Sequence, residues 1–253
     1  MKASVARFCG LSETYHKYRP HYPAHIVETL IEEAGLTKNS VIADIGSGTG
    51  LSCLPFLDNG NLVYGIEPNP EMRKIAGESL KNYPNFLQLP GTAENPGLPS
   101  SSIDFIFAGQ ALHWFDLQKC KKPLKEVAKK GGWFVIVWQE RNVSTDFMEE
   151  LEQMINEYSI DYNKVDHKNI DTKKLKSFFH PHSFEEKVFP YEQEFDLEGL
   201  KGRLLSCSYL PFNADKPGYD QMIKKIEEIF EKHKQDGKVT IPYHCKMYYG
   251  KFN

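Results

Sequence analysis

The sequence predicts an α/β protein with a doubly wound, mostly parallel sheet, and three observations support this prediction. Short apolar runs alternate with helix-like segments between residues 40 and 138. Two of these runs, 103–108 and 133–138, are almost continuously apolar, as strands buried on both faces are. A glycine-rich turn, 44–50, follows the first run and precedes a helix-like segment. This alternation is typical of parallel strands joined by crossover helices.

The composition is that of a globular protein with no strong charge. The chain has 253 residues, 31 Lys and Arg against 34 Asp and Glu, and a formal net charge of −3. One α/β domain can have this length. This weak negative charge predicts that the protein binds neither nucleic acid nor an anionic membrane. No run approaches the ~20 apolar residues of a membrane span.

The cysteine pattern favours a reducing compartment. The five cysteines are odd in number, widely spaced and without a Cys-x-x-Cys pair. They are Cys9, Cys53, Cys120, Cys207 and Cys245. Such a pattern fits buried free thiols better than a disulfide or zinc framework. We therefore expect a soluble cytoplasmic protein, whether monomer or dimer, and no metal. The pair His180 and His182 lacks further ligands at fitting spacing.

The first forty residues are expected to precede the sheet. Residues 15–23 are rich in tyrosine and proline. Each proline keeps the preceding residue out of the helical region, which predicts an irregular loop. Residues 24–34 carry an apolar stripe at helical spacing that ends at Gly35, which predicts a helix.

Alternation of apolar runs and amphipathic segments predicts the central elements in order. The strands are expected at 40–45, 62–67, 86–89, 103–108 and 133–138, and the helices at 50–58, 70–82 and 118–130.

The regular alternation of apolar runs and amphipathic segments ends at residue 138. Apolar spacing predicts helices at 144–160, 197–208 and 219–234, and alternation predicts strands at 184–195 and 239–249. The stretch 161–183 is polar, rich in lysine and histidine, and has no clear period.

The glycine turn DIGSGTG is the strongest functional motif. Glycines after a buried strand let the backbone turn tightly and approach a ligand. A dinucleotide site of the form Gly-x-Gly-x-x-Gly would need a third glycine at position 51, which is Leu51, and no P-loop pattern is present. Glu67 ends the second strand, where an acid can bind both hydroxyls of a ribose. The additional acid Asp44 would repel a pyrophosphate but not an ammonium or a sulfonium.

These motifs resemble class I S-adenosylmethionine-dependent methyltransferases. The resemblance rests on VIADIGSGTG (41–50), GIEPNPEM (65–72), GTAE (91–94), LPSSSID (98–104) and QALHWF (110–115). YHKYRPHYP (15–23) and the end of the chain are similar to a small-molecule subgroup that includes trans-aconitate methyltransferase.

The resemblance implies a Rossmann-like seven-stranded sheet, mostly parallel, with an antiparallel last strand and a helical lid insertion. It implies one domain: an N-terminal cap (1–39), a cofactor-binding core (40–138), mixed lid and sheet elements (139–235) and a closing strand (236–253).

The same resemblance assigns roles to residues near the glycine turn. Gly46, Ser47 and Gly48 would lie against the methionine part of S-adenosylmethionine. Asp44 would hold its amino group, and Glu67 its ribose.

Further roles follow from the matching motifs. Pro68 and Asn69 would lie beside the adenine, and Ala93 and Glu94 at its edge. Gln110 would line the floor under the sulfonium. Arg19, with Tyr18, would close over the cofactor and meet its carboxylate; a surface salt bridge is the alternative for Arg19.

The predicted reaction is methyl transfer to a small molecule, such as a carboxylate or another polar oxygen. His113 is the candidate base or substrate partner, and Trp114 the candidate aromatic wall of the substrate site, with core packing as the alternative for both. Arg203 and Arg141 are candidates for charge recognition. Two other functions stay open: a cofactor-binding scaffold or sensor without turnover, and a NAD-dependent oxidoreductase, which the missing glycine at position 51 disfavours.

Overall fold

A single seven-stranded sheet organises the protein, and its strand order is β3-β2-β1-β4-β5-β7-β6. The computed structural model describes residues 10–160 and 170–253. The strands are β1 (Val41–Ile45), β2 (Leu62–Ile66), β3 (Phe86–Leu89), β4 (Ile103–Gly109), β5 (Ala128–Arg141), β6 (Glu185–Phe195) and β7 (Val239–Lys251). The pairs among β1–β5 are parallel, whereas β7 runs antiparallel to both β5 and β6. The predicted fold, with its antiparallel last strand, is confirmed.

The strand order reverses between β1 and β4. The chain builds β1, β2 and β3 outward in one direction and then returns to place β4 on the other side of β1. Ligands of open α/β sheets bind at the carboxyl ends of the strands beside such a reversal. The glycine turn leaves β1 at this point.

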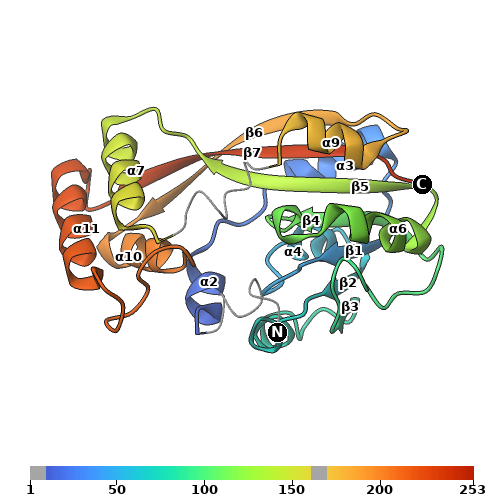
Figure 1. Ribbon diagram of the computed structural model, residues 1–253, viewed down its shortest axis with the longest axis horizontal. Helices are drawn as coiled ribbons and strands as arrows, with labels where there is room; N and C mark the ends of the chain where they lie inside the picture. The colour runs from blue at the N-terminus through green and yellow to red at the C-terminus, as the bar shows by residue number, and fades with distance from the viewer. Residues whose placement is uncertain (1–9, 161–169) are drawn as a thin grey trace.

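Helices cover both faces of the sheet (Figure 1). They are α2 (Ser12–Tyr18), α3 (His25–Ala34), α4 (Leu54–Asp58), α5 (Pro70–Ser79), the 3₁₀ turn η1 (Leu112–Trp114), α6 (Leu117–Val127), α7 (Asp146–Tyr158), α9 (Thr172–Phe179), α10 (Leu197–Leu205) and α11 (Tyr219–His233). None of the helices described is both long and apolar enough to cross a membrane.

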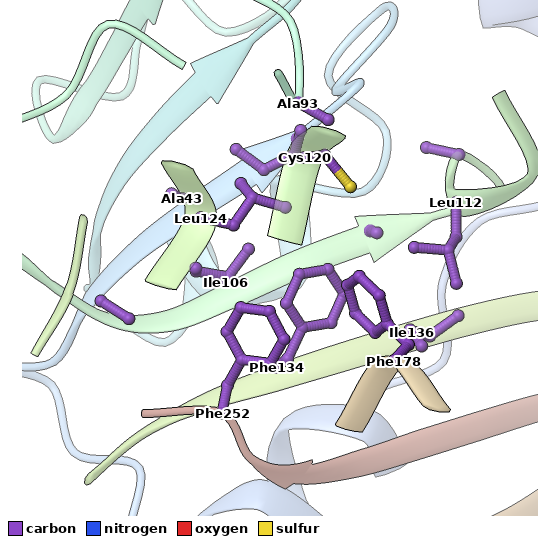
Figure 2. Close-up of a cluster of buried hydrophobic side chains, with 14 of the residues drawn as sticks. Ala43, Ala93, Ile106, Leu112, Cys120, Leu124, Phe134, Ile136, Phe178 and Phe252 are labelled. Carbon is purple, nitrogen blue, oxygen red and sulfur yellow. The ribbon is translucent and has the colours of Figure 1, made fainter. Parts of the chain in front are cut away.

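Adjacent residues of β1 belong to two different cores. Ala43 packs in the core that includes Leu124 of α6 and Phe178 of α9, which Figure 2 shows together with Phe134 of β5. Ile42 packs in the core that contains residues of α3 and α4. Side chains alternate across a strand, so this division places one helical layer on each face.

A third core lies beyond the central sheet. Helices α7, α10 and α11 pack together with Phe195 at the end of β6 and with Val239, Ile241 and Tyr243 at the start of β7. Figure 1 shows this helical cluster at one end of the molecule and β1–β4 at the other. Helix α2 contacts both α10 and α5, so it connects the two ends.

The structure corrects the prediction for residues 15–23. Residues up to Tyr18 belong to helix α2, and only the following residues are irregular. Arg19 is extended (φ −71°, ψ 147°), as expected before Pro20. Packing of the Tyr18 ring against Gly202 of α10 explains why this aromatic segment is helical.

Other elements also differ from their predicted bounds. The helix predicted at 118–130 ends at Val127, because Ala128 already pairs with Ile103 in the sheet. The stretch without a clear period contains α9, whose first turn is capped by the carboxylate of Asp171. Cys9, and residues 161–169 of the stretch without a clear period, lie outside the described residues.

Candidate functional site

The glycine turn has the backbone conformation that glycine allows. Gly46 and Gly48 have φ angles of 76° and 56°. A Cβ on Gly46 would lie 2.8 Å from the Cβ of Ala111, whereas a Cβ on Gly48 would meet nothing within 4 Å. The missing side chain of Gly46 therefore lets Ala111 pack closely against the turn, and the missing side chain of Gly48 leaves the backbone there accessible.

Glu67 is a buried acid held by the backbone. Its side chain is 8% exposed, and its two carboxylate oxygens accept hydrogen bonds from the amides of Asn69 (2.7 Å) and Gly48 (3.0 Å). Burial raises the pKa of Glu67, and the two amide hydrogen bonds oppose this shift. The amides link the end of β2 to the glycine turn and fix the carboxylate between them.

The larger of two adjoining pockets lies at the carboxyl ends of β1, β2 and β4. The predicted residues on its wall are Gly46, Gly48, Glu67, Pro68, Asn69, Ala93, Glu94, Gln110 and Trp114. These residues come from four separate segments of the chain, and the fold brings them together. The role of each residue stays a prediction.

The smaller pocket shares Tyr15, Gly46, Gly48, Gly109 and Gln110 with the larger one. It extends toward α2 and α10, and the further polar residues on its wall are Arg19, Ser47, Thr49, Ser52, Gln139 and Arg203. The predicted residues Arg19 and Ser47 thus lie in this second pocket.

Gln110 has an unusual backbone conformation at the junction of the two pockets. Its φ is 54°, and its amide donates to the carbonyl of Val137 (2.8 Å). The side-chain amide donates to the carbonyl of Gln139 (3.2 Å). A glutamine held in the left-handed region at the end of a strand is typical of a functional site.

Asp44 lies beneath the turn and is fully buried. Its Oδ2 accepts hydrogen bonds from the hydroxyl of Ser52 and from the Cys53 thiol (3.1 Å), and its Oδ1 has no partner among the described residues. Burial raises the pKa of Asp44 to about 7, although the bonds from Ser52 and Cys53 oppose the shift. Asp44 is not among the wall residues of either pocket, so the predicted contact with an amino group stays a prediction.

Besides Asp44, two more predicted residues lie away from the pocket walls. Tyr18 packs against Gly202, and the tyrosine that lines both pockets is Tyr15, one turn earlier on the same helix. His113 lies beside Trp114, with ring centroids 4.7 Å apart, but only Trp114 is on the wall.

Sequence reasoning missed several wall residues, notably Tyr15, Thr92, Phe115 and Gln139. Tyr15 could have been predicted if this segment had been identified as a helix, because it lies four residues before Arg19 and the Arg19 guanidinium lies over its ring at 4.6 Å. Residues 15–18 were predicted as a loop, in which this spacing has no meaning.

Comparison with known proteins agrees with this geometry. Residues 43–136 match the model of the methyltransferase domain family. An uncharacterized methyltransferase of Mycobacterium tuberculosis is 30% identical over 141 residues, which are 56% of this chain and 55% of that protein. The chain therefore spans about half the length of this relative.

Two further similarities cover more of the chain. An uncharacterized methyltransferase-like protein of Schizosaccharomyces pombe is 24% identical over 219 residues, 85% of this chain and 82% of that protein. A solved structure from Anaeromyxobacter dehalogenans, provisionally assigned as a type II methyltransferase, has a TM-score of 0.70 at 19% identity and covers 93% of this chain and 98% of that one. At this identity the structure supports the fold alone. Residues 43–136 therefore match a methyltransferase domain, and the sheet that surrounds them has the fold of the solved methyltransferase structure.

Proposed function

We propose that this protein transfers a methyl group from S-adenosylmethionine to a small-molecule acceptor, on a carboxylate or another polar oxygen. The observation that carries the proposal is the position of Glu67. Its buried carboxylate is fixed by two backbone amides and lies on the wall of the larger pocket, beside the open face of Gly48. An acid in this position of an α/β sheet binds ribose hydroxyls.

The larger pocket fits the adenosine part of the cofactor. Glu67 would accept hydrogen bonds from the ribose, and Pro68, Ala93 and Glu94 line the region that the adenine would occupy. Glu94 already accepts a hydrogen bond from the amide of Asp116 (3.1 Å), so its carboxylate has a defined position.

The smaller pocket fits the amino-acid part. The hydroxyls of Ser47 and Thr49 are buried, and neither has a hydrogen-bond partner among the described residues. Buried polar groups are almost always satisfied, so unpartnered ones on a pocket wall indicate a polar ligand. A nucleoside with a charged amino-acid tail would fill both pockets.

S-adenosylmethionine, when bound, supplies an electrophilic methyl group on its sulfonium. The protein then has to align the acceptor with that methyl group and exclude water. Tyr15 and Gln110, which line both pockets, lie where the two parts of the site join. A carboxylate acceptor is already ionised at neutral pH and requires no general base. Under this proposal His113 acts as a base only if the acceptor carries a proton, and a carboxylate acceptor does not need it.

Calorimetric titration with S-adenosylhomocysteine and with NADH tests the cofactor. We expect binding of S-adenosylhomocysteine alone, weakened at least tenfold by Glu67→Gln, because an amide accepts fewer hydrogen bonds from the ribose than a carboxylate does. Glu78→Gln, an exposed acid on the neighbouring α5, is the matched control and should bind normally. Binding of NADH in preference would overturn the proposal.

Formation of S-adenosylhomocysteine in the presence of small carboxylic acids and other polar metabolites tests the transfer. Turnover with one of them supports the proposal. Tight cofactor binding without turnover on any of them would instead favour a scaffold or sensor.

A further inference from the structure

Gln139, near the end of β5, is held in one orientation. Its backbone carbonyl accepts a hydrogen bond from the side-chain amide of Gln110 (3.2 Å), and its own Nε2 donates to the carbonyl of His21 (3.0 Å). A carbonyl oxygen can only accept, so the bond to His21 decides which side of the Gln139 amide carries the nitrogen. The side-chain oxygen Oε1 therefore points away from His21.

This Oε1 is a buried acceptor that lacks a donor. The Gln139 side chain is 7% exposed and lies on the wall of the smaller pocket, and Oε1 has no hydrogen-bond partner within residues 10–160 and 170–253. Arg19 and Arg203 line the same wall, and neither of them donates to it. Buried polar atoms are almost always satisfied, so this oxygen indicates a ligand that carries an O–H or N–H group.

The strand order separates Gln139 from the glycine turn. The turn follows β1, Gln110 follows β4, and Gln139 belongs to β5, while β4 lies between β1 and β5. Neighbouring strands are about 4.8 Å apart, which places Gln139 roughly 10 Å across the sheet from the turn. Ser47 and Thr49, whose hydroxyls also lack partners among the described residues, belong to the turn and not to the region of Gln139.

This separation puts Gln139 on the side from which a methyl acceptor approaches. The proposed ribose partner, Glu67, follows β2, and the amino-acid end of the cofactor is proposed to lie at the glycine turn after β1. The acceptor has to attack the methyl group in line, from the side opposite the sulfur. With the cofactor over β2 and β1, the side left for the acceptor is that of β4 and β5.

We propose that Gln139 is a specificity-determining residue and that it selects, as methyl acceptor, a carboxylic acid that also carries a hydroxyl or an amino group. The O–H or N–H of that group donates to Oε1 of Gln139. This inference rests on the proposed function and narrows its acceptor. A carboxylate by itself can only accept hydrogen bonds and leaves Oε1 unsatisfied. A site that binds a substrate O–H or N–H in this way rejects the analogue that lacks it.

Matched acids test this preference. Lactate is compared with propionate, malate and aspartate with succinate, and tartronate with malonate, the chiral acids being racemic. Members of a pair differ by one hydroxyl or amino group. Calorimetric titration into protein saturated with S-adenosylhomocysteine measures their affinity, and formation of S-adenosylhomocysteine from S-adenosylmethionine measures their turnover.

The test variant is Gln139→Met, which keeps the length of the side chain and removes the amide. Gln193→Met is the matched control. Gln193, on β6, also has a buried Oε1 without a partner among the described residues, but it lines neither pocket.

We expect the unsubstituted protein to favour the acid with the additional donor by roughly tenfold or more in at least one pair, because the other acid leaves a buried acceptor unsatisfied. Gln139→Met should reduce this preference to less than about threefold and should bind S-adenosylhomocysteine within twofold of the unsubstituted protein. Gln193→Met should retain the full preference. A purely structural role of Gln139 would weaken both members of a pair alike and leave the preference unchanged.

The inference is overturned if the members of every pair bind and react equally, if no acid binds, or if Gln139→Met keeps the preference. It is also overturned if Gln139→Met weakens S-adenosylhomocysteine but not 5′-methylthioadenosine, the same nucleoside thioether without the amino acid, because Oε1 would then serve the amino group of the cofactor. Failure of the unsubstituted protein to bind S-adenosylhomocysteine would instead overturn the proposed function.

If Gln139→Met does not fold by circular dichroism, Gln139→Glu takes its place. That variant keeps an acceptor oxygen and loses the donor to His21, so it should retain the preference for the acid with the additional donor. Loss of the preference in Gln139→Glu would assign it to the contact with His21 and overturn the role of Oε1.

Discussion

The two walls of the candidate site are built by different means. On the sheet wall the backbone carries the site: glycines follow β1, and the amides of Gly48 and Asn69 hold Glu67. On the helical wall side chains carry it: Arg19, which follows α2, and Arg203 of α10 line the smaller pocket, and the hydroxyl of Tyr243 in β7 accepts a hydrogen bond from Arg203. A backbone-built wall depends on a local turn, and a side-chain-built wall depends on the packing of whole helices. Substitutions should therefore act differently on the two walls.

The largest effect is expected at Gly46. A valine there would have to adopt a φ near 76° and place its Cβ 2.8 Å from Ala111 Cβ. Strain and overpacking together should lower the free energy of unfolding by roughly 2–5 kcal/mol. Urea denaturation measures the stability, and we expect titration with S-adenosylhomocysteine to show no binding.

Gly97→Val is the matched control for strain alone. Gly97 also has a positive φ, of 70°, but nothing lies within 4 Å of a Cβ placed there. Its cost should be about 1–2 kcal/mol, and nucleoside affinity should not change. Equal losses in both variants would mean that close packing beneath the turn contributes nothing.

A smaller effect, dependent on pH, is expected beneath the same wall at Asp44. The folded protein raises the pKa of this carboxyl to about 7, so it holds the proton more tightly than the unfolded chain does. The resulting stability is fully present below the pKa of the unfolded chain, near 4, and is lost as the pH rises toward 7. Relative to Asp44→Asn, the wild-type free energy of unfolding should fall by roughly 2–3 kcal/mol between pH 5 and pH 7.

Urea denaturation of both proteins across this range measures the difference. Asp220→Asn, which removes an exposed carboxylate of α11, should parallel the wild type at every pH. Parallel pH profiles for the wild type and Asp44→Asn would show that Asp44 is already ionised at pH 5.

The contrast between the walls also explains which features the sequence could predict. The residues that follow β1 and β2 are adjacent to apolar runs in the sequence, so the glycine turn and Glu67 could be assigned to one edge of the sheet. Arg203 and Arg141 were equivalent candidates, because only tertiary packing places Glu152 against one of them and the pocket beside the other. No pattern in the sequence predicts that pairing.

The fold, too, could be predicted from the sequence only in part. Apolar runs predicted the first five strands and alternation the last two, but the insertion of β7 between β5 and β6 follows from long-range pairing rather than from any local period. Helix α9 was missed because its buried residues, Leu175, Phe178 and Phe179, lie in a stretch dominated by lysine and histidine. Helix α2 was missed because tertiary contact with α10, and not its aromatic composition, determines its conformation.

The smallest effect is expected on α2, where the two walls meet. Tyr18 packs against Gly202, so Tyr18→Phe should keep that packing, change the free energy of unfolding by less than about 0.5 kcal/mol, and leave affinity for S-adenosylhomocysteine within twofold. Tyr15 lines both pockets and lies under the Arg19 guanidinium, so Tyr15→Leu should weaken that affinity roughly threefold, the loss expected from one cation–π contact. Calorimetric titration of both variants measures the difference. The opposite order would mean that Tyr18 reaches the cofactor, as the resemblance implied, and that α2 moves relative to α10 when the nucleoside binds.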